Sequence, residues 1–157
     1  MKHGVKIKMS VISDLKTLYE IDDSAWLEKT INLLKAKKFE SLDLDNLIEE
    51  LEDLDSEKKR RVESLLEQVI RHFLLLQYWT SERDYNKAHW ESEIVSFQNQ
   101  LKRYLTTNLR HHLEQSLPDI YIDARSYCMK KTQNTVMFPQ KCPYSLVHLL
   151  NPDSLEK

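Results

Sequence analysis

Glycine is almost absent from this chain, since Gly4 is the one glycine among its 157 residues. Tight β-hairpin turns need residues at positive φ, a role that falls mainly to glycine, asparagine and aspartate. A many-stranded β fold is therefore disfavoured. The glycine-rich loops that hold phosphates in P-loop enzymes and in dinucleotide-binding domains are excluded, because neither motif can be written without glycine.

A dominant charge, a long apolar run and an abundance of cysteine are also missing. The formal net charge is −2, so bulk electrostatics gives no reason to expect nucleic acid or an anionic membrane as a partner. No apolar run approaches the roughly 18 residues of a membrane span, and residues 1–10 lack the apolar region of a secretory signal. Two cysteines alone do not make a zinc site. We expect a cytoplasmic protein with reduced thiols and neither a membrane nor a nucleic acid as its partner.

Helical periodicity is what the sequence does contain, because apolar residues recur every three to four positions in five segments. A sixth, shorter helix is expected after the cap Ser145. The predicted elements are a helix after the N-cap Asp22, one from Asp43, one over about 57–79, one from about 90 to 105, one after the cap at 106–108, and a short one over 146–150. Residues 55–57 are expected to separate the second predicted helix from the third, and residues 80–87 are expected to form a polar loop. Pro118 is expected to kink the fifth helix.

These elements predict an all-α fold, a single compact bundle of about five helices with an extended C-terminal tail and a short terminal helix. Residues 1–18 show no clear pattern and are expected to form an N-terminal tail. Residues 19–150 would then form the helical domain, and residues 151–157 a C-terminal tail.

The order of landmarks along the chain resembles that of the family known as domain of unknown function 29, DUF29, whose members come largely from cyanobacteria. The landmarks are Tyr19, Asp22, Trp26, Leu34, Phe39, Asp43, Asn46, Glu49, Glu50, Asp53, Leu66, His72, Gln77, Tyr78, Trp90, Tyr121, Ala124 and Arg125, followed by Phe138-Pro139, Cys142-Pro143 and Tyr144-Ser145. The resemblance implies a helical domain over nearly the whole chain. It supplies no activity, substrate or catalytic residue, because the family has none established.

An acidic cluster with seven carboxylates and no base occupies residues 43–55. Glu49, Glu52 and Asp53 share a helix face and could hold Mg²⁺ or Mn²⁺, which prefer oxygen ligands. The helical wheel, however, directs these acids away from the stripe formed by Leu47, Leu51 and Leu54. If that stripe is buried, the acids form a solvated or partner-binding face, which is the reading we favour over a metal site.

Two single residues could carry chemistry. His72 lies at the edge of the apolar stripe of the third helix, and histidine is a common proton shuttle and metal ligand. A lone histidine beside a core is more often a hydrogen-bonded structural residue. Cys142 could be a nucleophile if a basic neighbour lowered its pKa, although an apolar plug under the docked tail fits it better.

The sequence therefore leaves three functions open. The favoured one is a protein-interaction or regulatory module that binds a protein partner or a second copy of itself. The alternative is a metal-assisted hydrolase that uses Glu49, Glu52 or Asp53 with His72, for which a divalent metal would be the cofactor. A second alternative is weak nucleic-acid binding through the basic run at residues 58–61, which acids flank on both sides.

Overall fold

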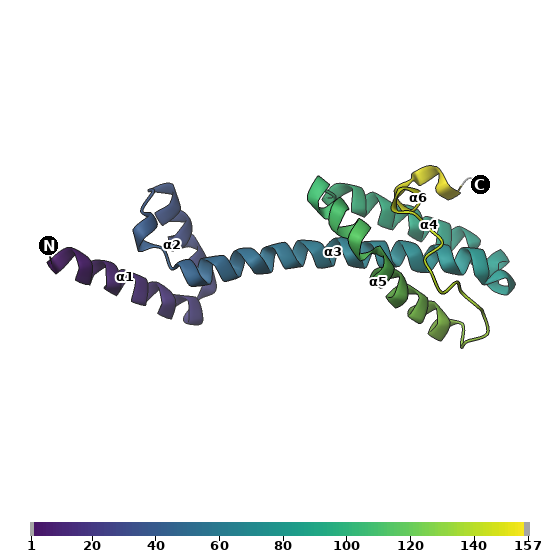
Figure 1. The fold of residues 1–157 in the computed structure, drawn as a ribbon, viewed down its shortest axis with the longest axis horizontal. Helices are drawn as coiled ribbons and strands as arrows, with labels where there is room; N and C mark the ends of the chain where they lie inside the picture. The colour runs from purple at the N-terminus through teal and green to yellow at the C-terminus, as the bar shows by residue number, and fades with distance from the viewer. Residues whose placement is uncertain (1, 156–157) are drawn as a thin grey trace. The chain divides into compact units, whose positions relative to one another are not determined.

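The protein is all-helical in a computed structural model that describes the backbone of residues 2–155 and the side chains of residues 11, 12 and 14–155. The elements are α1 (Lys2–Ile21), α2 (Asp23–Lys35), the 3-10 turn η1 (Phe39–Ser41), α3 (Leu44–Tyr78), α4 (Thr80–Tyr104), α5 (Thr107–Lys131), α6 (Leu146–Leu150) and the 3-10 turn η2 (Pro152–Leu155) (Figure 1). No strand occurs among the described residues. The predicted all-α class is thus confirmed.

Three helix boundaries differ from those expected. Most of residues 1–18, expected as a tail, lie in α1, where Val11, Leu15 and Leu18 recur at helical spacing. α3 continues through residues 55–57 as one helix of 35 residues, because no glycine or proline interrupts it and capping residues cost little inside an exposed helix. The predicted loop at residues 80–87 is the beginning of α4 for the same reason.

The predicted N-caps are confirmed. The Asp22 carboxylate accepts a hydrogen bond from the backbone N–H of Ala25 at 3.0 Å, and the Thr106 hydroxyl accepts one from Leu109 at 3.3 Å. Ser145 caps α6 in the same way. Each satisfies a backbone donor at the first turn that has no partner within its helix.

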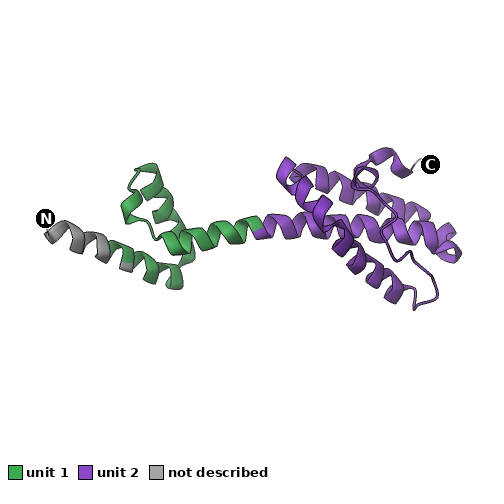
Figure 2. Ribbon diagram, in the orientation of Figure 1, with its two compact units in different colours: residues 1–55 green, residues 56–157 purple. Residues whose placement is uncertain are grey.

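The chain divides into two compact units, residues 1–55 and residues 56–157 (Figure 2). The second unit contains the core of the molecule, formed by α4, α5, α6 and the part of α3 after residue 55. Its buried apolar side chains are Val62, Leu66, Val69, Ile70, Phe73, Leu74, Leu75, Trp90, Ile94, Leu101, Leu109, Leu113, Ile120, Tyr121, Ala124, Cys128, Phe138, Tyr144, Leu146 and Leu149. Of the apolar stripe expected on the long helix, five members are buried and Leu65 and Leu76 are partly buried against the core; the buried ones are Val62, Leu66, Val69, Ile70 and Phe73.

The C-terminal segment after α5 is tied to the helices by polar side chains. The Tyr144 hydroxyl donates to Gln77 Oε1 at 2.6 Å, and the Tyr121 hydroxyl donates to the carbonyl of Pro139. The buried Gln98 amide donates to the carbonyls of Leu149 at 2.9 Å and Asn151 at 3.2 Å. Leu155, in the region expected as a free tail, also packs against the core.

The first unit is built differently, because few of its apolar side chains are enclosed. Among its described side chains, the buried apolar ones are Leu15, Trp26 and Leu42, accompanied by the polar Thr30 and Asp43.

None of the described helices is long and apolar enough to cross a membrane.

Candidate functional site

The first unit is organised around a buried carboxylate, that of Asp43, whose exposed fraction is 0%. Its Oδ2 accepts hydrogen bonds from Trp26 Nε1 at 3.2 Å and from Asn46 Nδ2 at 2.6 Å. Its Oδ1 has no hydrogen-bond partner. A buried carboxylate is costly unless it is hydrogen-bonded. The bond from Trp26 ties α2 to the beginning of α3, whereas the bond from Asn46 is local to the first turn of α3.

A second polar contact joins α1 to the same face of α3. The Tyr19 hydroxyl donates to Glu50 Oε1 at 2.8 Å, and the Tyr19 ring meets the Trp26 ring edge-on with centroids 5.0 Å apart. The hydrogen bond to Glu50 is the main reason that the pKa of Tyr19 is raised to about 12. The residues Tyr19, Trp26, Asp43 and Glu50 thus connect three helices.

The sequence patterns do not predict this network, although its members are landmarks of the family resemblance. The charge pattern places Asp43 and Glu50 with the other acids of residues 43–55, and nothing in a single sequence shows that a given aspartate is enclosed. Their place in an ordered set with Tyr19 and Trp26 is the one signal that the sequence offers.

The predicted burial of the Leu47, Leu51 and Leu54 stripe is wrong. Leu51 is 57% exposed and Leu54 is 47% exposed, whereas Leu47 is partly buried. Leu47 lies on the face of α3 that carries Asp43 and Glu50 and is partly buried with them, whereas Leu51 lies about 80–100° round the helix from that face. Leu54 lies on the same face but one turn beyond Glu50.

The residues proposed for a metal site belong to different units of the chain. Glu49, Glu52 and Asp53 are exposed on α3 in the first unit, and His72 lies in the second unit about five helical turns further along the chain. No group of three or more histidine, cysteine, aspartate or glutamate residues among the described ones could hold a metal ion. The structure thus provides no observation that favours the hydrolase hypothesis.

His72 makes contacts typical of a structural histidine. Its Nδ1 lies 2.7 Å from the carbonyl oxygen of Gln68, one turn earlier in α3, so Nδ1 carries the hydrogen and donates it. The ring lies against Phe97, with centroids 5.7 Å apart. Burial lowers the pKa of His72, outweighing the hydrogen bond to Gln68 and the nearby Glu93 carboxylate, which both raise it, while His89 and Lys131 lower it further.

We expect His72→Gln to flatten the dependence of stability on pH. Because the pKa of His72 is lower in the folded state, its contribution is complete above the unfolded-state pKa of about 6.5 and is lost as the pH falls from there through the folded-state pKa. Urea unfolding between pH 7.5 and about pH 5 measures the difference between wild type and variant. His111→Gln, at an exposed position on α5, is the matched control. An unchanged slope in His72→Gln would contradict the assignment.

Sequence reasoning also missed a contact between α3 and α5. His112 Nε2 lies 2.5 Å from Glu63 Oε1, and Ser116 Oγ lies 3.5 Å from the same nitrogen. A serine–histidine–carboxylate triad uses the two ring nitrogens for different partners, one for the serine and one for the acid. Here both partners lie at Nε2, so this arrangement is a contact between helices, and the 49 positions that separate Glu63 from His112 hide it from any local pattern.

Neither thiol is activated as a nucleophile. Burial raises the pKa of Cys128 to about 12, and its Sγ donates to the carbonyl of Arg71 at 3.5 Å. Burial also raises the pKa of Cys142, whose Sγ donates to the carbonyl of Tyr144 at 3.4 Å. Cys142 packs against the core, as expected of an apolar plug under the C-terminal segment.

We therefore expect the two thiols to react with a disulfide reagent only slowly in the folded chain. Cys142, which is half-buried, should react first, and Cys128 should react at the rate of unfolding, because the thiolate is the reactive species. Timed labelling with and without urea, followed by mass spectrometry of the peptides, measures both rates. Rapid labelling of native Cys128 would contradict this description.

The basic run at residues 58–61 is part of the helical surface. Arg61 forms an ion pair with Glu57 at 3.5 Å and lies over the Tyr104 ring, 4.8 Å from its centroid. These contacts direct its guanidinium toward its own chain.

Comparison with known proteins gives one match. No curated protein and no solved structure matches the chain. The model of the family described as Domain of unknown function DUF29 matches residues 18–155, a range slightly wider at both ends than the resemblance indicated. Because that match covers most of the sequence, the chain belongs to the DUF29 family.

Proposed function

We propose that the protein is an interaction module that binds a protein partner through its first unit, residues 1–55. The observation that carries the proposal is the inverted distribution of apolar side chains there. Among the described residues of this unit, three apolar side chains are buried and nine large apolar side chains are exposed. The exposed ones are Ile21, Leu27, Ile31, Leu34, Phe39, Leu44, Ile48, Leu51 and Leu54.

Six of these side chains form two stripes rather than scattered single residues. Leu27, Ile31 and Leu34 follow one another at i, i+4 and i+7 on α2, and Leu44, Ile48 and Leu51 do so on α3. That spacing places each set on one face of its helix. Single exposed apolar residues are normal on a protein surface, but contiguous ones mark sites of interaction.

The free energy that covering these apolar side chains would contribute supports association as the function of this surface. Covering a half-exposed leucine or isoleucine contributes about 1 kcal/mol, half of the value for full burial. The six stripe residues together would contribute on the order of 6 kcal/mol, which is comparable with the lower estimates of the entropic cost of association. A stable complex therefore requires that a partner also engages other parts of the first unit.

Site-specific photocrosslinking in cells tests the proposal. A photoreactive amino acid is placed at Ile31 or at Leu51 in the full chain, and at Ile122 as a control that is about as exposed (56%) but lies in the second unit. We expect protein adducts from positions 31 and 51 and none from position 122. Absence of adducts at both first-unit positions, or equal yields at all three, would contradict the proposed function.

A further inference from the structure

We infer that the partner of the first unit is a second copy of this chain, with the Leu44–Ile48–Leu51 stripe of each α3 seated in a groove between α1 and α2 of the other copy. The inference rests on the proposed function, since it names the partner that covers the α3 stripe of that surface. It is carried by the complementary chemistry of the stripe and of the groove.

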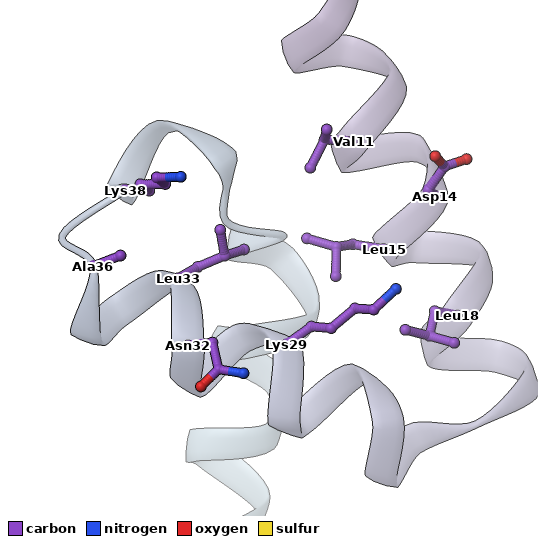
Figure 3. Close-up of a pocket in the computed structure, with 9 residues that line it drawn as sticks. All are labelled: Val11, Asp14, Leu15, Leu18, Lys29, Asn32, Leu33, Ala36 and Lys38. Carbon is purple, nitrogen blue, oxygen red and sulfur yellow. The ribbon is translucent and has the colours of Figure 1, made fainter.

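The groove lies between α1 and α2, and its volume is about 490 Å³ (Figure 3). Its apolar lining consists of Val11, Leu15, Leu18, Leu33 and Ala36. The close-up shows the α1 side chains facing α2 across the opening. A groove lined in this way accepts the apolar face of an amphipathic helix, a recurrent mode of protein recognition.

The charges on the groove lining favour binding of a helix with acidic side chains. Lys29 and Lys38 contribute two ammonium groups, and Asp14 contributes one carboxylate. In Figure 3 the Lys29 side chain extends from α2 toward α1 along the opening. An apolar helix face with acids beside it would therefore complement both the apolar lining and the positive charge of the groove. A basic helix would instead meet like charge.

The first part of α3 is such a segment. Leu44, Ile48 and Leu51 fall within about 60° of one another on the helical wheel. Asp45 and Glu52 lie within about 60° of Ile48 on one flank of this stripe, because residues three and four positions apart are neighbours on a helix. The stripe is thus apolar with an acidic edge, and all three of its apolar residues are exposed.

Symmetry makes a second copy the fitting occupant. Each copy carries one α3 stripe and one groove within the same 55 residues. Within one copy α3 contacts α1 and α2 through another face, that of Asp43 and Glu50, and through an exposed ion pair of Asp45 with Lys16 at 3.7 Å, so the apolar stripe itself is left uncovered. In a two-fold dimer the stripe of each copy meets the groove of the other, so the same contact forms twice. That doubling supplies the additional burial that the exposed stripes alone do not provide.

The experiment uses three variants of the full chain, each read by sedimentation and by native mass spectrometry. The stripe variant is Ile48→Lys with Leu51→Lys, the groove variant is Lys29→Glu with Lys38→Glu, and the control is Ile122→Lys. We expect the wild type and the control to be dimeric and each of the other two to dissociate, with at least about 100-fold weaker dimerisation.

Mixing the two defective variants provides the decisive readout. A heterodimer of the stripe variant with the groove variant retains one intact contact, formed by the unaltered stripe of one copy and the unaltered groove of the other. We therefore expect heterodimers in the mixture at concentrations where neither variant dimerises alone. All substituted positions are exposed, and circular dichroism checks that each variant keeps its helix content; if the stripe variant does not, the groove variant and Leu51→Lys alone are compared.

Other outcomes overturn the inference and separate it from the proposed function. A monomeric wild type whose positions 31 and 51 crosslink to a different protein refutes the dimer and leaves the interaction module standing. A monomeric wild type with no adducts refutes both. A dimer that survives both the stripe and the groove substitutions, or a wild-type monomer whose native mass spectra show an apolar small molecule bound, refutes the dimer through this groove.

Discussion

Replacement of Trp26 by alanine is expected to unfold residues 1–55 while the second unit stays folded. Trp26 is one of the three buried apolar side chains described in the first unit, and truncation of a buried tryptophan costs about 3–5 kcal/mol. The substitution also removes one of the two donors to the buried Asp43 carboxylate and leaves Asn46 as the other, which weakens the hydrogen bonding of a buried charge. A unit with so few buried apolar side chains is expected to have a small free energy of unfolding, so a loss of this size should unfold it.

Hydrogen exchange read peptide by peptide measures this effect. Peptides from α2 and from the beginning of α3 should lose protection in Trp26→Ala, and peptides from α4 and α5 should keep theirs. Trp26→Phe, which keeps an aromatic ring for Tyr19 but lacks the indole N–H, should fall between wild type and Trp26→Ala. Loss of protection in both units together would show that they unfold as one.

Replacement of Phe73 by alanine should destabilise the second unit by about 3–5 kcal/mol. Phe73 is buried on α3, and its ring lies 5.5 Å from that of Tyr144 and 5.4 Å from that of His148. The residue therefore joins the helical core to the C-terminal segment. Urea unfolding measures the loss in free energy, and limited proteolysis over residues 133–144 should report release of the segment before the helices unfold.

The control for Phe73→Ala is Tyr85→Ala, at a side chain on α4 that is 90% exposed. A substitution at such a position should change the free energy of unfolding by no more than about 0.5 kcal/mol. If Phe73→Ala lowered stability without any earlier cleavage of the segment, the ring contacts with Tyr144 and His148 would not be what holds it in place.

Helical periodicity located the second unit correctly, because apolar burial dominates there. Residues such as Val62, Val69 and Phe73 recur on one face of α3, and that face is the buried one. The same rule failed for Leu51 and Leu54, for two different reasons. Leu51 lies about 80–100° round α3 from the face on which Asp43 and Glu50 form their hydrogen bonds, and Leu54 lies on that face but one turn beyond Glu50. A pattern of apolar residues carries no information about those hydrogen bonds or about where the contact with α1 and α2 ends.

The contacts that local patterns could not supply are those between distant residues. Gln77 and Tyr144 are 67 positions apart, and Glu63 and His112 are 49 apart. Neither pair has a spacing rule, because each depends on how complete helices pack. The continuity of α3 through residues 55–57 was missed for a different reason, since aspartate and serine favour a helix N-terminus without forbidding a helix interior.

The docking of the C-terminal segment has a consequence for the order of events in biosynthesis. Phe138, Tyr144, Leu146 and Leu149 belong to the same buried cluster as Phe73 and Leu113, so α3, α4 and α5 leave the ribosome before the side chains that cover them. During that interval the nascent chain presents Phe73 to solvent, to chaperones and to neighbouring chains. The second unit can therefore complete its core only after residue 149 has been synthesised, and an arrested chain ending within α5 should be a chaperone client.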